Sequence, residues 1–264
     1  MSEPPLAHYL LNLRDNYSHD LLASFYKDLM VPNFGQFESE LEPVSVWFKQ
    51  FEDADHQSLY TLHVILVLDQ DPSKLSHHSK AVIYGGVCCE YYPKSNCGLM
   101  TYIAVSPTAK ASGLGKLLVS HVLASLNAEA RSRGHARCHA IYLETNNDHV
   151  DASKDVMLPA TRRKVLHKLG FRILKFDYVQ PRLSDDQDKC RDLYFAAHDS
   201  FLEEHVGDGT SKVHVLHSQH LLEFIKEFYV VLQGEDSITE DEDYLKAEKT
   251  LKGLKYIEVY ATPI

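Results

Sequence analysis

The chain has 264 residues and a formal net charge of −10, and 44% of its residues are hydrophobic while 24% are charged. A chain of this length can bury a full hydrophobic core, and its composition is that of an ordinary globular protein. The excess of acidic residues argues against a nucleic-acid-binding protein, because such a protein needs a basic surface to meet the phosphates.

The sequence shows no pattern of secretion or membrane insertion. The chain opens with M-S-E-P-P, without the basic start and apolar stretch of a secretory signal. Its longest apolar run, residues 62–68, is interrupted by His63 and is too short to span a bilayer. The five cysteines form neither a C-x-x-C motif nor a tight framework, which favours reduced thiols. We therefore expect a cytoplasmic protein without a membrane partner.

The 16 histidines include two close pairs, His135 with His139 and His217 with His220. No cysteine or carboxylate near either pair in the sequence completes the ligand set that a zinc ion needs. The sequence therefore predicts no metal site.

Hydrophobic periodicity predicts a mixed α/β fold. Helices are expected over residues 18–30, 40–51, 114–133, 160–169 and 221–232, with a further short helix opened by the acidic run 235–243. Strands are expected over residues 61–69, 81–92, 99–105, 137–145, 171–179, 192–198 and 255–261. The turn sequence P-K-S-N-C-G joins the second and third of these strands into a hairpin. Within the second strand, Gly85 and Gly86 mark a bulge or a close backbone approach.

A loop with the sequence V-S-P-T-A-K-A-S-G-L-G-K connects the strand that ends at Val105 to the following helix. The first turn of a helix has N–H groups without internal partners, and the helix dipole adds partial positive charge there. Small residues let an anion approach this backbone, and Lys110 and Lys116 add charge. The pattern is typical of a phosphate-binding loop.

Two common nucleotide-binding motifs do not fit this loop. A Walker A motif requires Gly five residues before the Gly-Lys pair and Ser or Thr after it, where this chain has Lys110 and Leu117. A dinucleotide-binding motif requires a third glycine, where this chain has Leu118, and a loop that leaves the strand directly. Both classes are therefore excluded.

The segment V-S-P-T-A-K-A-S-G-L-G resembles the acyl-CoA pyrophosphate loop of the GNAT superfamily of N-acetyltransferases. Val105, Pro107, Gly113 and Gly115 match the pattern of that family. Lys110 stands where Arg or Gln is usual, so one side-chain contact to the pyrophosphate differs from the family. The backbone N–H groups of the loop that would bind the pyrophosphate match the family.

The resemblance extends over residues 18–181, where the order of helices and strands and the sequence H-K-L-G-F are similar to the family. It implies a mixed, mostly antiparallel sheet flanked by helices. We expect residues 1–181 to form this acetyltransferase core. Residues 182–264 form a C-terminal α/β part that either completes the same sheet or makes a small second lobe, and the periodicity leaves both arrangements open.

By this resemblance the protein would use acetyl-CoA as a cosubstrate. The backbone of Ile103, Ala104 and Val105 would hold the pantetheine arm, and a backbone N–H there would support the developing oxyanion. Asn146, just past a later strand, could reach the pantetheine or the acceptor. The pyrophosphate would lie on the loop and first helical turn, at Lys110, Ala111, Ser112, Gly113, Leu114, Gly115 and Lys116.

The implied reaction acetylates a primary amine, which must attack as a neutral nucleophile although an alkyl amine is mostly protonated at pH 7. A base must take that proton, and Glu90 and Glu144, each late in a strand, are the two candidates. Many family members carry a tyrosine, as acid for the departing thiolate, where this chain has Leu166. Tyr178 is the first substitute for that acid and Tyr102 the second.

The acceptor is left open by the sequence, since a small molecule, a peptide N-terminus or a lysine would each supply an amine. The oligomeric state is open as well. The long loop 146–159 either shapes the acceptor pocket or is a surface insertion. Leu166 replaces the usual tyrosine. A second hypothesis is therefore that the protein has the fold and the CoA site but little or no catalytic activity, and acts as an acyl-CoA-binding or regulatory module.

Overall fold

The computed structural model of the protein describes residues 8–36, 41–74, 81–109, 113–153, 155–183, 187–206 and 212–264. The chain divides into two compact units. The first comprises Met1–Glu90 and Met100–Ser125, and the second comprises Tyr91–Leu99 and Leu126–Ile264.

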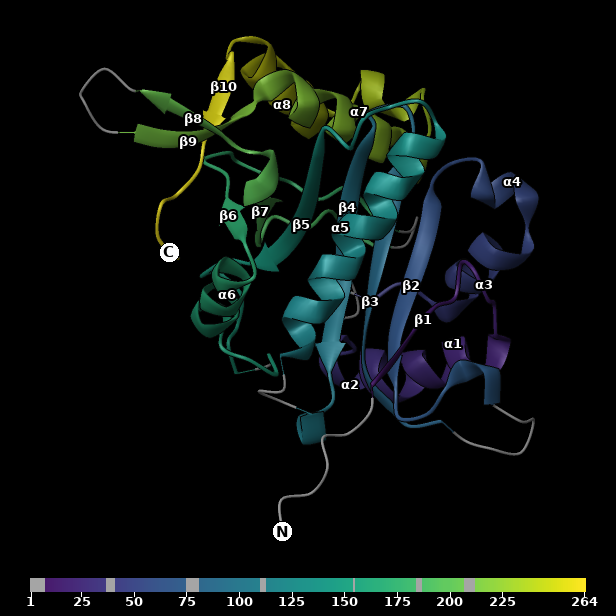
Figure 1. The fold of residues 1–264 in the computed structure, drawn as a ribbon. Coiled ribbons are helices and arrows are strands. Elements are labelled where there is room, and N and C mark those ends of the chain that lie inside the picture. Colours follow the sequence, from purple (N-terminus) through teal and green to yellow (C-terminus); the bar gives the residue numbers. More distant parts are fainter. Residues whose placement is uncertain are drawn as a thin grey trace. The chain divides into compact units, whose positions relative to one another are not determined.

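The strands form two sheets (Figure 1). They are β1 (Tyr9–Asn12), β2 (Thr61–Leu68), β3 (Ile83–Tyr92), β4 (Cys97–Val105), β5 (Ala140–Asn146), β6 (Phe171–Ile173), β7 (Leu193–His198), β8 (Glu203–Val206), β9 (Lys212–His217) and β10 (Tyr256–Glu258). A seven-stranded sheet has the order β1-β2-β3-β4-β5-β7-β6, and a three-stranded sheet has the order β10-β9-β8. Pairing is antiparallel between β1 and β2, between β7 and both its neighbours, and throughout the smaller sheet. The predicted mixed α/β fold is confirmed.

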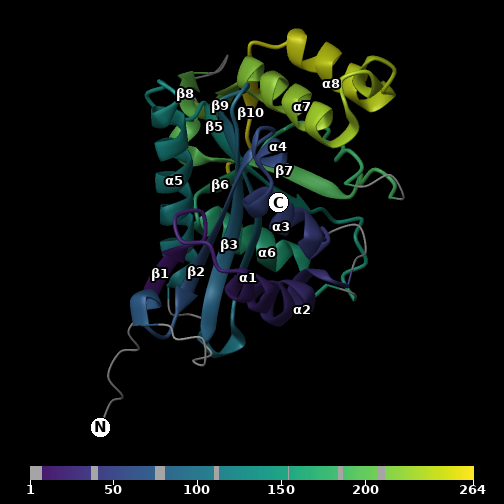
Figure 2. The ribbon, with the colours of Figure 1, turned by 90° about the vertical axis from the view of Figure 1, so that its right-hand side faces the viewer.

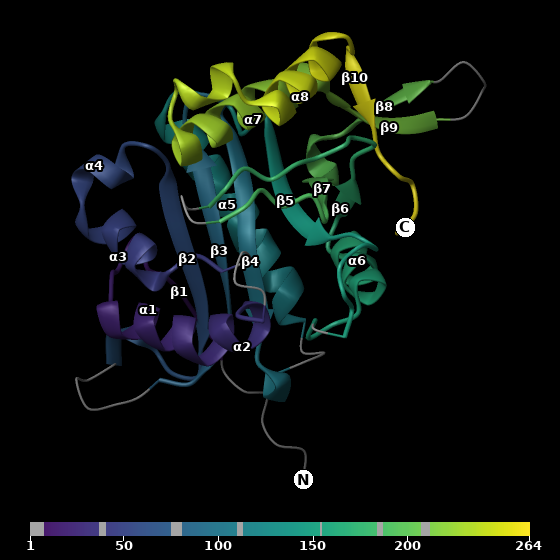
Figure 3. The ribbon, with the colours of Figure 1, turned by 180° about the vertical axis from the view of Figure 1, so that it is seen from behind.

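The helices cover the sheets within each unit. They are α1 (His19–Phe25), α2 (Val31–Phe34), α3 (Val44–Glu52), α4 (Ala54–Gln57), α5 (Leu114–Ser132), α6 (Pro159–Lys168), α7 (Ser218–Gln233) and α8 (Glu242–Lys252). In the first unit, α1, α2 and α3 lie on one face of β2 and β3 (Figure 3). No helix in the described part of the chain is both long and apolar enough to cross a membrane.

The helix predicted over residues 18–30 begins where expected and continues further. Ser18 caps it, because its Oγ accepts a hydrogen bond from the backbone N–H of Leu21 at 3.3 Å. A π-helical stretch, Tyr26–Met30, then joins α1 to α2. Pro32 follows this stretch, where the regular ladder of hydrogen bonds is already interrupted, so its missing N–H is tolerated.

The helix predicted over residues 40–51 starts later than expected. Pro43 has an extended backbone with φ −58° and ψ 137°, and α3 begins only at Val44. The residue before a proline is disfavoured in helical conformation, so Glu42 stays outside the helix. Its side chain turns back to Trp47, whose Nε1–H donates to Glu42 Oε2 at 3.1 Å.

Gly85 and Gly86 provide the close backbone approach that the sequence predicted. A Cβ on Gly86 would lie 2.5 Å from Phe25 Cε2 and 2.9 Å from Leu66 Cδ2. A Cβ on Gly85 would lie 3.0 Å from the carbonyl oxygen of Ala104. Glycine at these two positions therefore lets β3 approach both α1 and the end of β4.

In the second unit, α7 holds the turn between β3 and β4. Phe224 packs against Tyr92 with ring centroids 5.3 Å apart. Glu227 is only 5% exposed and accepts hydrogen bonds from the backbone N–H groups of Lys94 at 2.9 Å and Ser95 at 2.7 Å. Such donors offset the cost of burying a carboxylate. On its other side α7 packs beside α8 (Figure 2).

The strand predicted over residues 171–179 is shorter in the structure, because β6 ends at Ile173. Beyond it, the backbone N–H of Lys175 donates to the carbonyl of Glu258 at 2.8 Å. Tyr178 then turns to Glu144, and the chain returns to the sheet only as β7. We call residues 174–192 the connecting segment. Its apolar run has strand propensity, yet beyond Ile173 it contacts the sheet only locally: the N–H of Leu174 donates to the carbonyl of Phe195 at 2.9 Å, and Tyr178 reaches Glu144 through its side chain.

Four histidines from separate segments meet in the second unit. His139 and His220 stack with ring centroids 4.5 Å apart and an interplanar angle of 12°. His217 lies 5.5 Å from His220, and His135 lies 6.0 Å from His139. Burial, together with the neighbouring His139 and His217, lowers the pKa of His220. A proton on His220 is therefore unfavourable.

We expect Gly86→Ala to destabilise the protein by about 1–3 kcal/mol, because overpacking a core forces its neighbours to move. Gly253→Ala is the control, since its Cβ would make only an ordinary contact, 3.4 Å from the carbonyl oxygen of Thr250. Urea unfolding followed by circular dichroism measures both. Equal stability of the two variants would contradict the close approach of β3 and α1.

Stability is expected to fall as the pH drops below about 6.5, the ordinary pKa of histidine. Because the pKa of His220 is lowered in the fold, the unfolded chain binds the proton more readily in this range. His220→Gln should therefore reduce the loss of unfolding free energy between about pH 7.5 and 5.5. An identical pH dependence in the variant and the parent protein would show that the stacked histidines do not control it.

Candidate active site

The strand, loop and helix that the sequence singled out begin in the first unit. β4 ends at Val105, and the backbone N–H of Ser106 donates to the carbonyl of Tyr84 at 2.8 Å, which fixes where the chain leaves the sheet. Of the expected pantetheine contacts, Ala104 is buried while Ile103 and Val105 are half-buried. Lys110, Ala111 and Ser112 lie outside the described residues.

Gly113 stands at the start of α5 in a conformation that suits a bound anion. Its φ is +83°, which favours glycine, and a Cβ there would meet no atom of the described residues within 4 Å. The backbone N–H of Leu117 donates to its carbonyl at 3.2 Å, which makes Gly113 the N-cap. The N–H groups of residues 114–116, which include Leu114, Gly115 and the exposed Lys116, therefore have no acceptor within the helix. These residues fit a phosphate group.

Glu90 is buried in β3, with 5% of its surface exposed. The pKa values of two phenols, Tyr60 and Tyr102, are raised mainly by burial. The charges of Glu90 and Glu42 raise them further. The two carboxylates therefore lie near the same pair of tyrosines, all in the first unit.

Glu42 is a candidate that the sequence analysis missed. Burial raises the pKa of its carboxyl, although the hydrogen bond from Trp47 acts in the opposite direction. The backbone of Glu42 is held as well, because its carbonyl accepts from Tyr26 Oη at 2.8 Å and its N–H donates to Tyr102 Oη at 3.2 Å. The only signal in the sequence was a glutamate before Pro43, and no pattern shows which rings surround it.

In the second unit, Glu144 accepts hydrogen bonds from two side chains of the connecting segment. Tyr178 Oη donates to its Oε1, and Gln180 Nε2 donates to its Oε2 at 2.9 Å. Tyr178 stacks on Phe195 with ring centroids 4.5 Å apart. Burial, reinforced by Glu144, raises the pKa of Tyr178 well above its ordinary value. The structure thus brings Glu144 and Tyr178 together, with the phenol proton directed at the carboxylate.

Asn146 and Leu166 also belong to the second unit. Asn146 is buried, and its Nδ2 donates to Asp155 Oδ2 at 3.1 Å, so its side chain holds the loop that follows β5. Leu166 is buried in α6 and lines a small cavity together with Thr145 and Arg163. A leucine in this place brings no proton donor.

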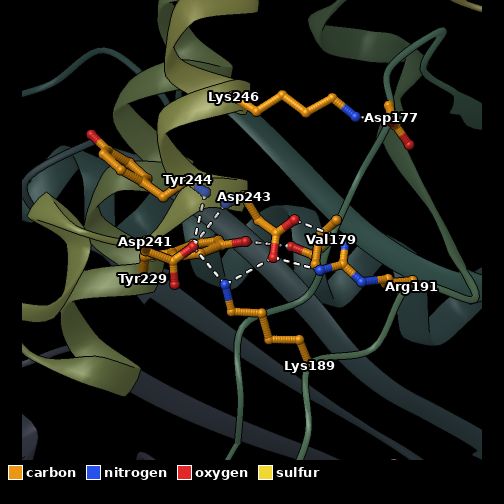
Figure 4. A network of polar contacts seen from close by, with 9 residues as sticks. All are labelled: Asp177, Val179, Lys189, Arg191, Tyr229, Asp241, Asp243, Tyr244 and Lys246. Atoms are coloured by element: carbon orange, nitrogen blue, oxygen red, sulfur yellow. Dashed lines mark hydrogen bonds and ion pairs between the residues drawn. The ribbon is translucent and has the colours of Figure 1, made fainter.

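The connecting segment is tied to the start of α8 by ion pairs (Figure 4). Lys189 Nζ lies 2.5 Å from Asp241 Oδ1 and 2.9 Å from Asp243 Oδ2. Arg191 donates from both terminal nitrogens to Asp243, each at 2.8 Å. Such a bidentate pair has a defined direction as well as charge attraction. Lys189 and Arg191 of the connecting segment are therefore held in one geometry.

The earlier half of the same segment has its own attachments. Tyr229 Oη, on α7, donates to the carbonyl oxygen of Val179 at 2.7 Å, directly beside Tyr178. Lys246 Nζ, on α8, lies 2.6 Å from Asp177 Oδ2, although both side chains are exposed. The C-terminal helices thus hold the backbone on either side of the tyrosine that reaches Glu144.

A model of the acetyltransferase (GNAT) family matches residues 22–171, more than half of the chain. The chain therefore belongs to the GNAT family of acetyltransferases, and the resemblance found in its glycine loop is confirmed. Members of this family transfer acetyl groups from acetyl-CoA. No curated protein sequence matches the chain significantly.

Similar solved structures include three acetyltransferases. One, a GNAT-family protein from Bacteroides thetaiotaomicron, is 15% identical with a TM-score of 0.44, over 73% of this chain and 86% of that chain. The ribosomal-protein-S18-alanine N-acetyltransferase from Escherichia coli is 13% identical with a TM-score of 0.41, over 73% and 93%. A Bacillus subtilis acetyltransferase in complex with CoA is 14% identical with a TM-score of 0.40, over 74% and 98%. The family assignment rests on the family model.

Asp243→Ala is expected to lower the free energy of unfolding by about 1–3 kcal/mol, because Lys189 and Arg191 lose a shared partner. Lys246→Ala is the control, since it removes an ion pair whose side chains are 69% and 77% exposed, and such pairs contribute roughly 0–1 kcal/mol. Urea titration of both variants tests the difference. If Lys246→Ala were as harmful as Asp243→Ala, the partly buried pairs would not be what holds the connecting segment.

Proposed function

We propose that the protein transfers an acetyl group from acetyl-CoA to a primary amine, by direct attack of the amine in a ternary complex. Membership of the GNAT family supports acyl transfer, and the amine acceptor is the finer part of this proposal. Acetyl-CoA would supply the activated acetyl group. The acceptor would be a small molecule or an amine of a peptide or protein.

The observation that carries the proposal is the geometry of Gly113. A glycine at φ +83°, where a Cβ would meet no atom of the described residues within 4 Å, caps a helix of 19 residues that follows the loop. A pyrophosphate placed there would accept hydrogen bonds from the free N–H groups of the first turn and lie at the positive end of the helix dipole. Lys116 would add a positive charge.

Two further groups would position the pantetheine arm. The backbone of Ile103, Ala104 and Val105 would hydrogen-bond to it, and an N–H of this strand end would stabilise charge on the reacting carbonyl oxygen. Asn146 would offer its Oδ1 or the second hydrogen of its Nδ2, since one Nδ2 hydrogen already donates to Asp155.

The proton of the attacking amine would pass to a carboxylate. Glu144 accepts hydrogen bonds from Tyr178 and Gln180, and donors of this kind stabilise the charged carboxylate, which weakens it as a base. Glu90 is buried in β3. The donors on Glu144 make Glu90 the first candidate for the base, and the hydrogen bond to Glu144 assigns Tyr178 to holding that carboxylate rather than to protonating the thiolate.

Gly113→Asp should weaken CoA binding at least about tenfold, because a carboxylate would face the pyrophosphate at the helix N-terminus. Gly134→Asp is a matched control: Gly134 follows the other end of α5, has φ +88° and also has open space around it. Both variants therefore carry similar backbone strain. Isothermal titration calorimetry with CoA measures the affinity. Unchanged affinity in a folded Gly113→Asp variant would rule out the proposed pyrophosphate site.

Acetyl transfer itself is tested by thiol release from acetyl-CoA with a panel of primary amines. Glu90→Gln should lower kcat more than Glu144→Gln if the assignment of the base is correct. Tight CoA binding without turnover of any amine would instead favour the acyl-CoA-binding module suggested by Leu166.

A further inference from the structure

His198, the last residue of β7, is a buried histidine at the start of a short 3₁₀ turn, Asp199–Phe201. It is 8% exposed, and its ring packs edge-on against Phe171 of β6 with centroids 5.1 Å apart. The next two residues, Asp199 and Ser200, are exposed. A buried imidazole and an exposed hydroxyl group are therefore two residues apart in the chain.

The hydrogen bonds of His198 determine which of its ring nitrogens carries the proton. The backbone N–H of Ser200 lies 3.3 Å from Nδ1 and can only donate, so Nδ1 offers a lone pair and has no proton. In the 2.8 Å contact between Nδ1 and Ser200 Oγ, the hydroxyl must then be the donor. The serine proton is therefore directed at a nitrogen that is able to accept it.

The opposite ring nitrogen, Nε2, lies against the turn before β6. A Cβ on Gly170 would be 2.7 Å from Nε2, so only glycine, here at φ +96°, lets the ring lie this close. Burial lowers the pKa of His198, against the opposing effects of Asp199 and of a hydrogen bond to the backbone of Leu169. The ring is therefore neutral at pH 7 and fixed in orientation, as a base that activates a hydroxyl group must be.

The charges around Ser200 favour a neutral reaction partner. Asp199 Oδ1 lies 3.5 Å from His198 Nδ1, where it would stabilise an imidazolium and repel an anion such as a phosphate ester. Arg137 Nη1 donates to the carbonyl oxygen of Ser200 at 3.1 Å, and its charge would stabilise an oxyanion that forms during a reaction. An acyl thioester meets both conditions, since it approaches uncharged and passes through an oxyanion.

Capping of the turn does not by itself account for this arrangement. The cap is complete with the N–H of Ser200 bonded to His198 Nδ1, and the same N–H would be present without the hydroxyl group. The hydroxyl is a second donor to a nitrogen that has one lone pair. A serine in this place therefore adds a chemical property that the turn does not require.

We propose that Ser200 is a nucleophile activated by His198, and that it accepts the acyl group of a small acyl thioester as a serine ester. Ser200 Oγ bonds to the acyl carbon, and the hydroxyl proton passes to His198 Nδ1. The carbon–sulfur bond breaks, and the departing thiolate takes this proton, which returns His198 to its neutral form. The inference goes beyond the proposed acetylation of amines and does not depend on it.

The probe for this reaction is S-acetyl-N-acetylcysteamine, a thioester without phosphate groups. Peptide mass spectrometry measures the rate at which each serine of the parent protein gains an acetyl group, and hydroxylamine removes that group from an ester but not from an amide. Ser200 should react at least about tenfold faster than Ser132, because general-base assistance contributes a factor of this size or more. Ser132 is a suitable comparison, since it is an exposed serine whose Oγ donates to the carbonyl of Glu129 at 2.8 Å.

His198→Asn tests the base. The Oδ1 of asparagine is able to accept the N–H of Ser200 in place of Nδ1, but an amide does not take up a proton at pH 7. We expect acylation of Ser200 to slow at least about tenfold, while the control Ser132→Ala leaves it unchanged. Circular dichroism checks that both variants are folded. An unchanged rate in folded His198→Asn overturns the inference, and so do equal rates at Ser200 and Ser132 in the parent protein, a comparison that needs no variant.

Gly113→Asp separates this inference from the proposed function. Because the probe has no pyrophosphate, its reaction with Ser200 should be the same in this variant as in the parent protein. Loss of the reaction in a folded Gly113→Asp variant would mean that the acetyl group reaches Ser200 through the CoA site, and would overturn the inference. Acylation of Ser200 without turnover of any amine would support the inference while the proposed function fails.

Discussion

Glutamate carboxylates that are held by hydrogen-bond donors organise this protein. Glu227 accepts from two backbone N–H groups and so fixes the turn between β3 and β4. Glu144 gathers the connecting segment through Tyr178 and Gln180. Glu42 accepts from Trp47 in the first unit. A buried charge costs several kcal/mol unless such donors satisfy it, so each of these contacts selects one arrangement of the chain around it.

These carboxylates differ in what their surroundings do to them. Donors are directed at both oxygens of Glu144, and its carboxylate therefore fixes side chains of the connecting segment. Glu42 accepts from Trp47 at Oε2, is half-buried, and burial raises the pKa of its carboxyl.

The parts of the fold that the sequence predicted are those governed by local rules. Helical spacing located α5 and α7, and Gly85 and Gly86 correctly marked a close approach. The prediction was less accurate where contacts with residues distant in the sequence determine the backbone conformation. The run 171–179 has strand propensity, yet β6 ends at Ile173, and Tyr178 contacts the sheet through its side chain, which donates to Glu144 of β5. The prediction placed the start of α3 within 40–51 but overlooked that Pro43 excludes Glu42 from the helix.

By itself, the sequence determined the family, the glycine loop and the end of the strand before it, because a short contiguous motif and a periodic pattern carry that information. It also named Glu144 and Tyr178, but not that they are hydrogen-bonded to each other. Only the tertiary structure decided which carboxylates are buried together with aromatic rings. Tyr102 is 60 residues from Glu42 in the chain, and hydrogen bonding and desolvation depend on neighbours in space rather than in sequence.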